Sequence, residues 1–261
     1  MDLKLKGKVA LVTGASRGIG QAIAQELARE GMSLLLVGRD AEALAETTHA
    51  TARLGAPQTE IHLADLRLPE AAAETVAVAV QHFGGLDLLV NCAGATKRGD
   101  FFSLTDADWE DGFALKFHGA VRLSRAAWPH LVARQGSVIN IVGVGGSTPS
   151  ADFTIGGSVN SAFLNFTKAL ADIGGKAGVR VNAISPGFIH TTRLDRTIEA
   201  RMKETGVARE KAEADIMSAL KVQRFGKPEE IGHLAAFLAS TQASYIHSTI
   251  INIDGGATKG L

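Results

Sequence analysis

A glycine-rich stretch near the N-terminus constrains this chain most. Residues 13–20 read TGASRGIG, and they lie between an apolar run at 9–12 and a segment with the period of an amphipathic helix. A strand, a glycine turn and a helix in this order let the backbone approach a bound group, and the free N–H groups at the helix start attract an anion. The spacing is G-x-x-x-G-x-G and not the more general G-x-G-x-x-G, so a simple glycine turn is the alternative.

Each glycine of this stretch has an expected role. Gly14 and Gly18 allow a tight turn and close approach to a ligand, and Gly20 lets the new helix pack against the strand. The expected anion is the pyrophosphate of a dinucleotide. The residues predicted to hold it are Gly14, Ser16, Arg17, Gly18, Ile19 and Gly20.

Composition limits the classes of protein that fit. The 261 residues are 46% hydrophobic and 21% charged, with zero formal net charge, which suits one α/β domain over 1–261 and argues against nucleic acid as a partner. The single Cys92 cannot form an internal disulfide, and no early apolar segment resembles a signal peptide or is long enough to span a membrane. We therefore expect a cytoplasmic protein with no membrane partner and no metal.

Short apolar runs alternate with segments of helical period along the whole chain, which is typical of a parallel sheet with crossover helices on both faces. Strands are expected at 9–12, 34–37, 61–63, 86–90, 137–142, 179–184 and 249–253. Helices are expected at 18–30, 41–54, from 69 onward, 105–134, 153–173 and 228–238. Residues 190–220 are polar and lack a strand run, and we expect them to form a substrate lid over the sheet edge.

Particular residues are expected to start the helices. Asp40 and Asp152 are predicted N-caps, and Thr105 with Asp108 resembles a capping box. Pro69 suits the first turn of the third helix. Tyr245, the only tyrosine, is expected to have a packing role.

Several spaced motifs together identify a family. The chain resembles the short-chain dehydrogenase/reductases over nearly its whole length. The resemblance lies in residues 13–20, 65–66 (DL), 91–94 (NCAG), 180–182 (RVN), 185–187 (SPG), 224–230 (RFGKPEE) and 253–256 (IDGG). It implies a Rossmann-like, doubly wound parallel sheet of seven strands in the order 3-2-1-4-5-6-7, a nicotinamide dinucleotide, and a homo-tetramer packed through two long middle helices, with a homo-dimer as the alternative.

Charge favours NADP over NAD. NADP carries a phosphate dianion on its adenine ribose where NAD carries a hydroxyl. Where relatives that prefer NAD carry an acid, this chain has Gly38, followed by Arg39, and Arg17 projects from the phosphate loop on the same side. Two guanidinium groups can clamp a phosphate. The alternative is that Arg17 and Arg39 are ordinary solvated charges, which leaves NAD as the less favoured cofactor.

The resemblance also assigns the rest of the cofactor site. Asp65 and Leu66 are expected beside the adenine. The residues expected beside the adjoining ribose are Asn91, Ala93 and Gly94. Those expected on the nicotinamide side are Pro186, Gly187, Ile189 and Thr191, although 186–187 also suits a simple turn.

The chain departs from its relatives where the family does its chemistry. The family uses a Tyr as acid or base, a Lys four residues later, a Ser that orients the carbonyl and an Asn that holds a relay water. Counting from neighbouring motifs places these four roles at Gly156, Asn160, Gly143 and Lys116, respectively. We expect the two glycines to leave a wider cleft.

Lys116 and Asn160 are the candidate catalytic residues. They carry the family's Lys and Asn types in exchanged positions, which suggests that the cation moved to the neighbouring helix and was not lost. From there Lys116 would stabilise a developing oxyanion with a lowered pKa, and Asn160 would keep a neutral hydrogen bond to the ribose. The alternative is a site that no longer works, with Lys116 turned to solvent.

Two functions from different classes follow. One is an NADP(H)-dependent oxidoreductase with a non-standard active site that acts on a small carbonyl, alcohol or conjugated enoyl substrate. The other is a dinucleotide-binding protein of the same fold with non-redox chemistry or a binding role alone, because fold does not decide function.

Overall fold

A parallel sheet forms the centre of the computed structural model, which describes residues 2–259. Within these residues the strand order is 3-2-1-4-5-6-7, as predicted. The strands are β1 (Val9–Thr13), β2 (Ser33–Gly38), β3 (Thr59–Leu63), β4 (Leu88–Asn91), β5 (Ser137–Ile141), β6 (Arg180–Pro186) and β7 (Ile250–Ile253). All pairings are parallel, and Val12 of β1 pairs with Leu36 of β2 and Val90 of β4. All seven carboxyl ends therefore meet at one edge.

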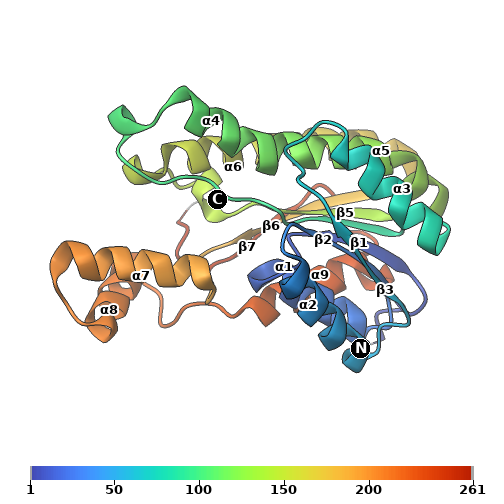
Figure 1. Ribbon diagram of the computed structural model, residues 1–261, viewed down its shortest axis with the longest axis horizontal. Helices are drawn as coiled ribbons and strands as arrows, with labels where there is room; N and C mark the ends of the chain where they lie inside the picture. The colour runs from blue at the N-terminus through green and yellow to red at the C-terminus, as the bar shows by residue number, and fades with distance from the viewer. Residues whose placement is uncertain (1, 260–261) are drawn as a thin grey trace.

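Helices cover both faces of the sheet (Figure 1). They are α1 (Gly18–Arg29), α2 (Ala41–Leu54), α3 (Ala71–Phe83), α4 (Asp106–Phe113), α5 (Gly119–Arg134), α6 (Thr154–Ala177), α7 (Thr192–Thr205), α8 (Arg209–Leu220) and α9 (Pro228–Ala239). Figure 1 shows α3 to α6 on one face and α1, α2 and α9 on the other. On β2, Leu34 and Leu36 pack in the α1 and α9 core, whereas Leu35 and Val37 pack in the α3 and α5 core. This alternation explains why the strands are apolar throughout.

Two of the four predicted helix starts are confirmed. Asp40 accepts a hydrogen bond from the Ala43 N–H at 3.1 Å, and Thr105 forms the capping box with Asp108 at the start of α4. These side chains satisfy N–H groups that the helix itself leaves open.

The other two predicted starts were wrong. Pro69 precedes α3, because the first helical bonds run from the N–H groups of residues 73 and 74 to the Glu70 carbonyl. Asp152 does not cap α6, because its carboxylate is held by Ser150 and by Arg98, the latter at 2.8 Å.

The predicted packing role of Tyr245 was also wrong, since its side chain is fully exposed. The Ile246 N–H donates to the Ala243 carbonyl in a turn that packs Ile246 against the core. Tyr245 is left outside.

The helix predicted for 105–134 is interrupted. A π-helical turn, Ala114–His118, joins α4 to α5. Such turns add a residue to the helix and occur often at functional sites. Lys116 lies within this turn, on the element that faces the carboxyl ends of β4 and β5.

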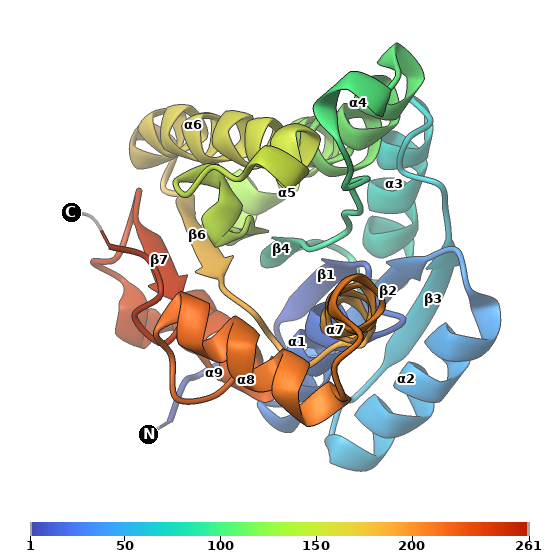
Figure 2. The same cartoon turned by 90° about the vertical axis from the view of Figure 1, so that its left-hand side faces the viewer.

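Residues 192–220 form two helices beyond the carboxyl edge of the sheet. α7 and α8 have a small apolar cluster of their own around Leu194, Ile198, Ala212 and Phe225. Figure 2 shows them on one side of the strand ends, with α4 and α6 on the other. No helix within residues 2–259 is both long enough and apolar enough to cross a membrane.

Candidate functional site

The glycine loop after β1 forms a cradle that side chains would fill. Gly14 has a φ of +66°, and a β-carbon there would lie 3.0 Å from the Cα of Ala93. A β-carbon on Gly20 would lie 2.2 Å from the Gly14 carbonyl oxygen. The expected turn and close packing are therefore both present. Thr13 completes the arrangement, because its Oγ1 accepts from the N–H groups of residues 92 and 93 and donates to the Val90 carbonyl.

The start of α1 is open to an anion. Gly18 begins the helix with a φ of +58°, and Arg17 before it provides no side-chain cap. Gly18 also lies close to the residue that precedes α7, since a β-carbon on it would lie 3.2 Å from Cγ2 of Thr191. Uncapped N–H groups, a glycine cradle and a flanking threonine fit the pyrophosphate of a dinucleotide. Ser16 lies half-buried in this loop, and Ile19 lies half-buried in the first turn of α1.

Arg17 and Arg39 are both exposed beside this loop. A guanidinium nitrogen of Arg17 lies 3.9 Å from a carboxylate oxygen of Asp40, and one of Arg39 lies 3.8 Å from Asp65. Pairs this long and this exposed contribute little to stability. Both cations are therefore free to turn toward a phosphate.

Asp65 is held mainly by Arg67. The Arg67 guanidinium donates to both carboxylate oxygens at 2.6–3.1 Å, and these hydrogen bonds keep the pKa of Asp65 below its usual value. The Leu66 side chain is 5% exposed. A ligand at this edge would therefore meet an ion-paired carboxylate and little apolar surface from Leu66.

The predicted ribose residues divide into two groups. Asn91 is buried, and its amide donates to Asn140 at 2.9 Å and to Ser124 at 3.3 Å, so its side chain faces the interior of the sheet and helix layer. Ala93 and Gly94 lie on the loop after β4, where Ala93 packs against Gly14.

The predicted nicotinamide residues follow β6. Pro186 ends the strand, and the Gly187 N–H donates to the Ile253 carbonyl at 3.1 Å. A β-carbon on Gly187 would lie 2.7 Å from Cβ of Asp254, so only glycine fits there. Ile189 is buried, and two residues later Thr191 lies close to Gly18.

Lys116 is a buried cation at the carboxyl edge. The residue is only 8% exposed, which excludes the alternative in which the side chain turns to solvent. The ammonium donates to the Val142 carbonyl, directly before Gly143, and the methylenes cross Gly94, whose β-carbon would lie 2.9 Å from Cδ of Lys116. Burial lowers the pKa of Lys116 to about 7, and the charge of Arg193 on α7 adds to this effect.

Asn160 lies beside Gly143. A β-carbon on Gly143 would lie 3.3 Å from Nδ2 of Asn160, and the φ of +122° at Gly143 is strained for any side chain. The Asn160 side chain is buried, and its Oδ1 has no hydrogen-bond partner within the described residues. A buried oxygen without a partner is costly, so this atom is ready to accept from a ligand.

The wider cleft expected at Gly156 was wrong. A β-carbon on Gly156 would lie 2.0 Å from Cζ of Phe153, so the aromatic ring fills that position. The Arg98 guanidinium carbon lies 4.0 Å from the centroid of the same ring. Sequence reasoning missed both residues, because a contact between residues 98 and 153 leaves no local pattern.

The other partner missed from the sequence is Arg193, in the first turn of α7. Its guanidinium donates to the Gly94 carbonyl at 2.9 Å. Gly94 therefore contacts both Lys116 and Arg193. Cys92 lies in the same neighbourhood, where burial raises the pKa of its thiol to about 12 and keeps it unreactive.

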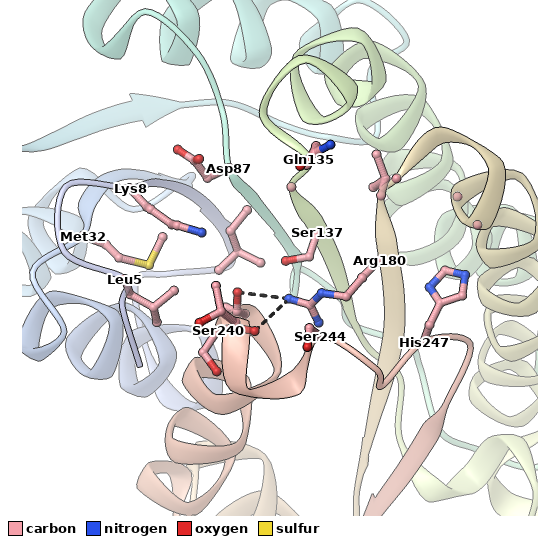
Figure 3. A pocket seen from close by; sticks show the side chains of 18 residues that line it. Leu5, Lys8, Met32, Asp87, Gln135, Ser137, Arg180, Ser240, Ser244 and His247 are labelled. Carbon is pink, nitrogen blue, oxygen red and sulfur yellow. Dashed lines mark hydrogen bonds between the residues drawn. The ribbon is translucent and has the colours of Figure 1, made fainter. Parts of the chain in front are cut away.

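A hollow of about 510 Å³ at the opposite edge of the sheet contains none of the predicted site residues. Figure 3 shows Arg180 reaching from β6 toward the chain at Ser240. Its guanidinium donates to four carbonyls at the end of α9, those of residues 238, 239, 240 and 243. This arginine stabilises a helix C-terminus.

Comparisons with known proteins agree with this geometry. The family described as Enoyl-(Acyl carrier protein) reductase matches residues 14–258. The 3-oxoacyl-(acyl-carrier-protein) reductase FabG of Pseudomonas aeruginosa is 35% identical over 258 residues, 97% of this chain and 98% of that protein. Oxidoreductase UcpA of Escherichia coli K12 is 33% identical over 98% of this chain and 96% of its own length.

A solved structure is equally similar. The L-sorbose reductase of Gluconobacter frateurii, complexed with NADPH and L-sorbose, superposes with a TM-score of 0.95 at 32% identity and covers 100% of both chains. The sheet order, the glycine cradle and these matches lead to one conclusion: the chain belongs to the short-chain dehydrogenase/reductase family.

Proposed function

We propose that this protein is an NADP(H)-dependent oxidoreductase that acts on a carbonyl, alcohol or conjugated enoyl substrate through a rebuilt proton-transfer site. The observation that carries the proposal is the buried ammonium of Lys116 at the carboxyl edge, beside Gly143 and Gly94. A buried lysine without a carboxylate partner is costly, and such groups cluster at functional sites.

The cofactor assignment has two supports. The L-sorbose reductase structure contains NADPH, and in this chain Arg17 and Arg39 lie exposed beside the phosphate loop. The cradle of Gly14, Gly18 and Gly20 would hold the pyrophosphate at the start of α1. NADPH, when bound, supplies a hydride.

Lys116 would stabilise the negative charge that develops on the substrate oxygen when the hydride is transferred. Its ammonium can stabilise an oxyanion by a charge-assisted hydrogen bond, and a pKa of about 7 lets it also donate the proton near neutral pH. The two resident hydrogen-bonding groups near Gly143 are then complementary. Lys116 donates, and Oδ1 of Asn160 accepts from a ligand hydroxyl such as that of the ribose.

The active site would lack the family's Ser, Tyr and Lys. Gly143, Gly156 and Asn160 stand at those positions by sequence, and Phe153 occupies the room beside Gly156. General acid or base catalysis contributes on the order of 10²–10⁴ in rate, while orientation by the bound cofactor is a separate contribution. Hydride transfer therefore does not depend on the tyrosine alone.

The same ring favours a second candidate function. An apolar side chain in the proton donor's place would suit a protein that binds a dinucleotide without redox chemistry. NADP⁺ binding would occur in both cases and cannot separate them. NADPH oxidation, followed with a library of carbonyl and enoyl compounds, separates them because only the oxidoreductase consumes NADPH in equal amount with product.

The proposal extends to the lid, the oligomeric state and the cellular compartment of the protein. α7 and α8 would act as a substrate lid, since Thr191 at their start lies close to Gly18, where an added β-carbon would be 3.2 Å from Cγ2 of Thr191. The protein would form a tetramer, or else a dimer, through α5 and α6. It would act in the cytoplasm on a small molecule.

A further inference from the structure

Two cations converge on Gly94 without an anionic partner. Arg193 donates to the Gly94 carbonyl at 2.9 Å, and the methylenes of Lys116 cross the Gly94 Cα on their way to the Val142 carbonyl. Within residues 2–259, neither cation has a carboxylate oxygen within 4.0 Å. Each is held by one neutral carbonyl.

The surroundings add positive charge. Arg98 and Arg196 both repel Arg193, and Arg193 repels Lys116. The nearby acids are already engaged, since Asp152 pairs with Arg98 at 2.8 Å and Asp195 pairs with Arg209. Lys116 and Arg193, two cations without a paired carboxylate at the carboxyl edge of the sheet, therefore favour an anionic ligand.

We propose that the substrate is a small oxo acid, whose carboxylate is bound by Arg193 and whose carbonyl oxygen is directed at Lys116. This inference rests on the proposed function and names its substrate class. A guanidinium matches a carboxylate through two parallel hydrogen bonds, and the bond to Gly94 would be exchanged for them. Arg193 lies on α7, so carboxylate binding would also fasten the lid to the loop after β4.

NADPH and Lys116 together supply the hydride and the proton that reduction of the carbonyl requires. The carbonyl carbon of the oxo acid gains the hydride of NADPH, and its oxygen gains a proton from Lys116, which water then reprotonates. The products are a hydroxy acid and NADP⁺. The carboxylate itself is unchanged and serves only for binding and orientation.

One other anion competes for the same arginine. The cofactor's diphosphate offers the same anionic oxygens, so the test must separate the two sources. Binding of NADP⁺ is measured first by calorimetry. The protein saturated with NADP⁺, which cannot reduce a ketone, is then titrated with matched pairs: 2-oxobutanoate and its methyl ester, and acetoacetate and its methyl ester.

The wild type should bind one of the acids at least tenfold more tightly than its ester. In Arg193→Gln, the affinities for the acid and its ester should differ by less than threefold, and the affinity for NADP⁺ should change by less than threefold. Arg193→Lys should restore only part of the preference for the acid, because lysine lacks the planar guanidinium. Arg201→Gln is the matched control, since it removes an exposed charge from the same helix, one that pairs with Glu204, and should change neither affinity.

Three results of the binding measurements would overturn the inference. They are no binding of any acid, equal affinity for acid and ester, and a tenfold loss of NADP⁺ affinity in Arg193→Gln with the acid preference intact. Reduction of neutral ketones without dependence on Arg193 would also reject it, while preserving the proposed function. Acid binding that depends on Arg193, without NADPH oxidation, would support the carboxylate site and contradict the redox function.

Discussion

A β-carbon on Gly156 would lie 2.0 Å from Cζ of Phe153. The Phe153 ring therefore occupies the space that a side chain at position 156 would need. The ring also passes within 2.9 Å of the β-carbon position of Gly145, and the guanidinium of Arg98 covers it at 4.0 Å. The Phe153 ring thus packs against Gly145 and Gly156, and the Arg98 guanidinium lies over the ring in a cation–π contact.

This packing predicts that a tyrosine at 156, where we propose that the family's acid or base would stand, will not fit by itself. Gly156→Tyr should lower the free energy of unfolding by about 1–3 kcal/mol, because the new side chain overlaps Phe153. Phe153→Ala should make room, so the double variant should be more stable than the sum of the two single changes implies, by roughly 0.5–3 kcal/mol. Urea denaturation of all four proteins measures this coupling, and strictly additive losses would contradict it.

The glycine cradle predicts a sharp loss at Gly20. Gly20→Ala would place a β-carbon 2.2 Å from the Gly14 carbonyl, so the loop must shift and NADP⁺ affinity should fall at least tenfold. The matched control is Gly175→Ala in α6, where the β-carbon would meet only His247 at 3.6 Å. That change should leave affinity intact and stabilise the helix by roughly 0.5–1 kcal/mol. Equal affinities in the two variants, measured by calorimetry, would argue against the cradle.

Arg39 should set the choice between cofactors. Arg39→Ala should weaken NADPH binding roughly tenfold or more and leave NADH binding nearly unchanged, because a charge-assisted hydrogen bond contributes about 1.5–3 kcal/mol. Removing Arg17 as well should reduce the preference further. Arg53→Ala, an exposed cation at the end of α2, is the control. A wild type that binds NADH as tightly as NADPH would reject the assignment.

The fold followed from the sequence because its signals are local. Apolar runs, the glycine turn and the capping residues Asp40 and Thr105 each act over a few residues, and the resulting sheet has the expected order. The π-helical turn around Lys116 was not predicted, since its residues also suit an ordinary helix.

The site was less predictable because its decisive contacts join distant segments. Phe153 packs against Gly156 because of the path that the chain takes before α6. Arg193 reaches the Gly94 carbonyl because of the position of α7. The position of Lys116 near the edge followed from its motif spacing. Its burial depended on the space that Gly94 leaves for its methylenes.

Lys116 should leave a signature in the pH dependence of stability. Its folded pKa of about 7 lies well below the unfolded value near 10.4, so between these pH values the unfolded chain binds more protons and stability from this group rises with pH. The free energy of unfolding of wild type relative to Lys116→Met should therefore rise from pH 7 to pH 10, by up to about 1.4 kcal/mol per pH unit. Lys97→Met, an exposed control, should show no such rise. A flat difference for Lys116→Met would mean an ordinary lysine pKa.

If Lys116 assists hydride transfer from NADPH, deuterium on the cofactor should reach the product at a rate that depends on this lysine. Wild type is given NADPH deuterated at the transferred position and the carbonyl and enoyl library, and product is analysed by mass spectrometry. We predict one deuterium in the product for each NADPH consumed, with a rate at least 100-fold lower in Lys116→Met and NADP⁺ affinity changed only a few-fold. Product without deuterium, no turnover of any compound, or an unchanged rate in Lys116→Met would contradict a role for Lys116 in hydride transfer.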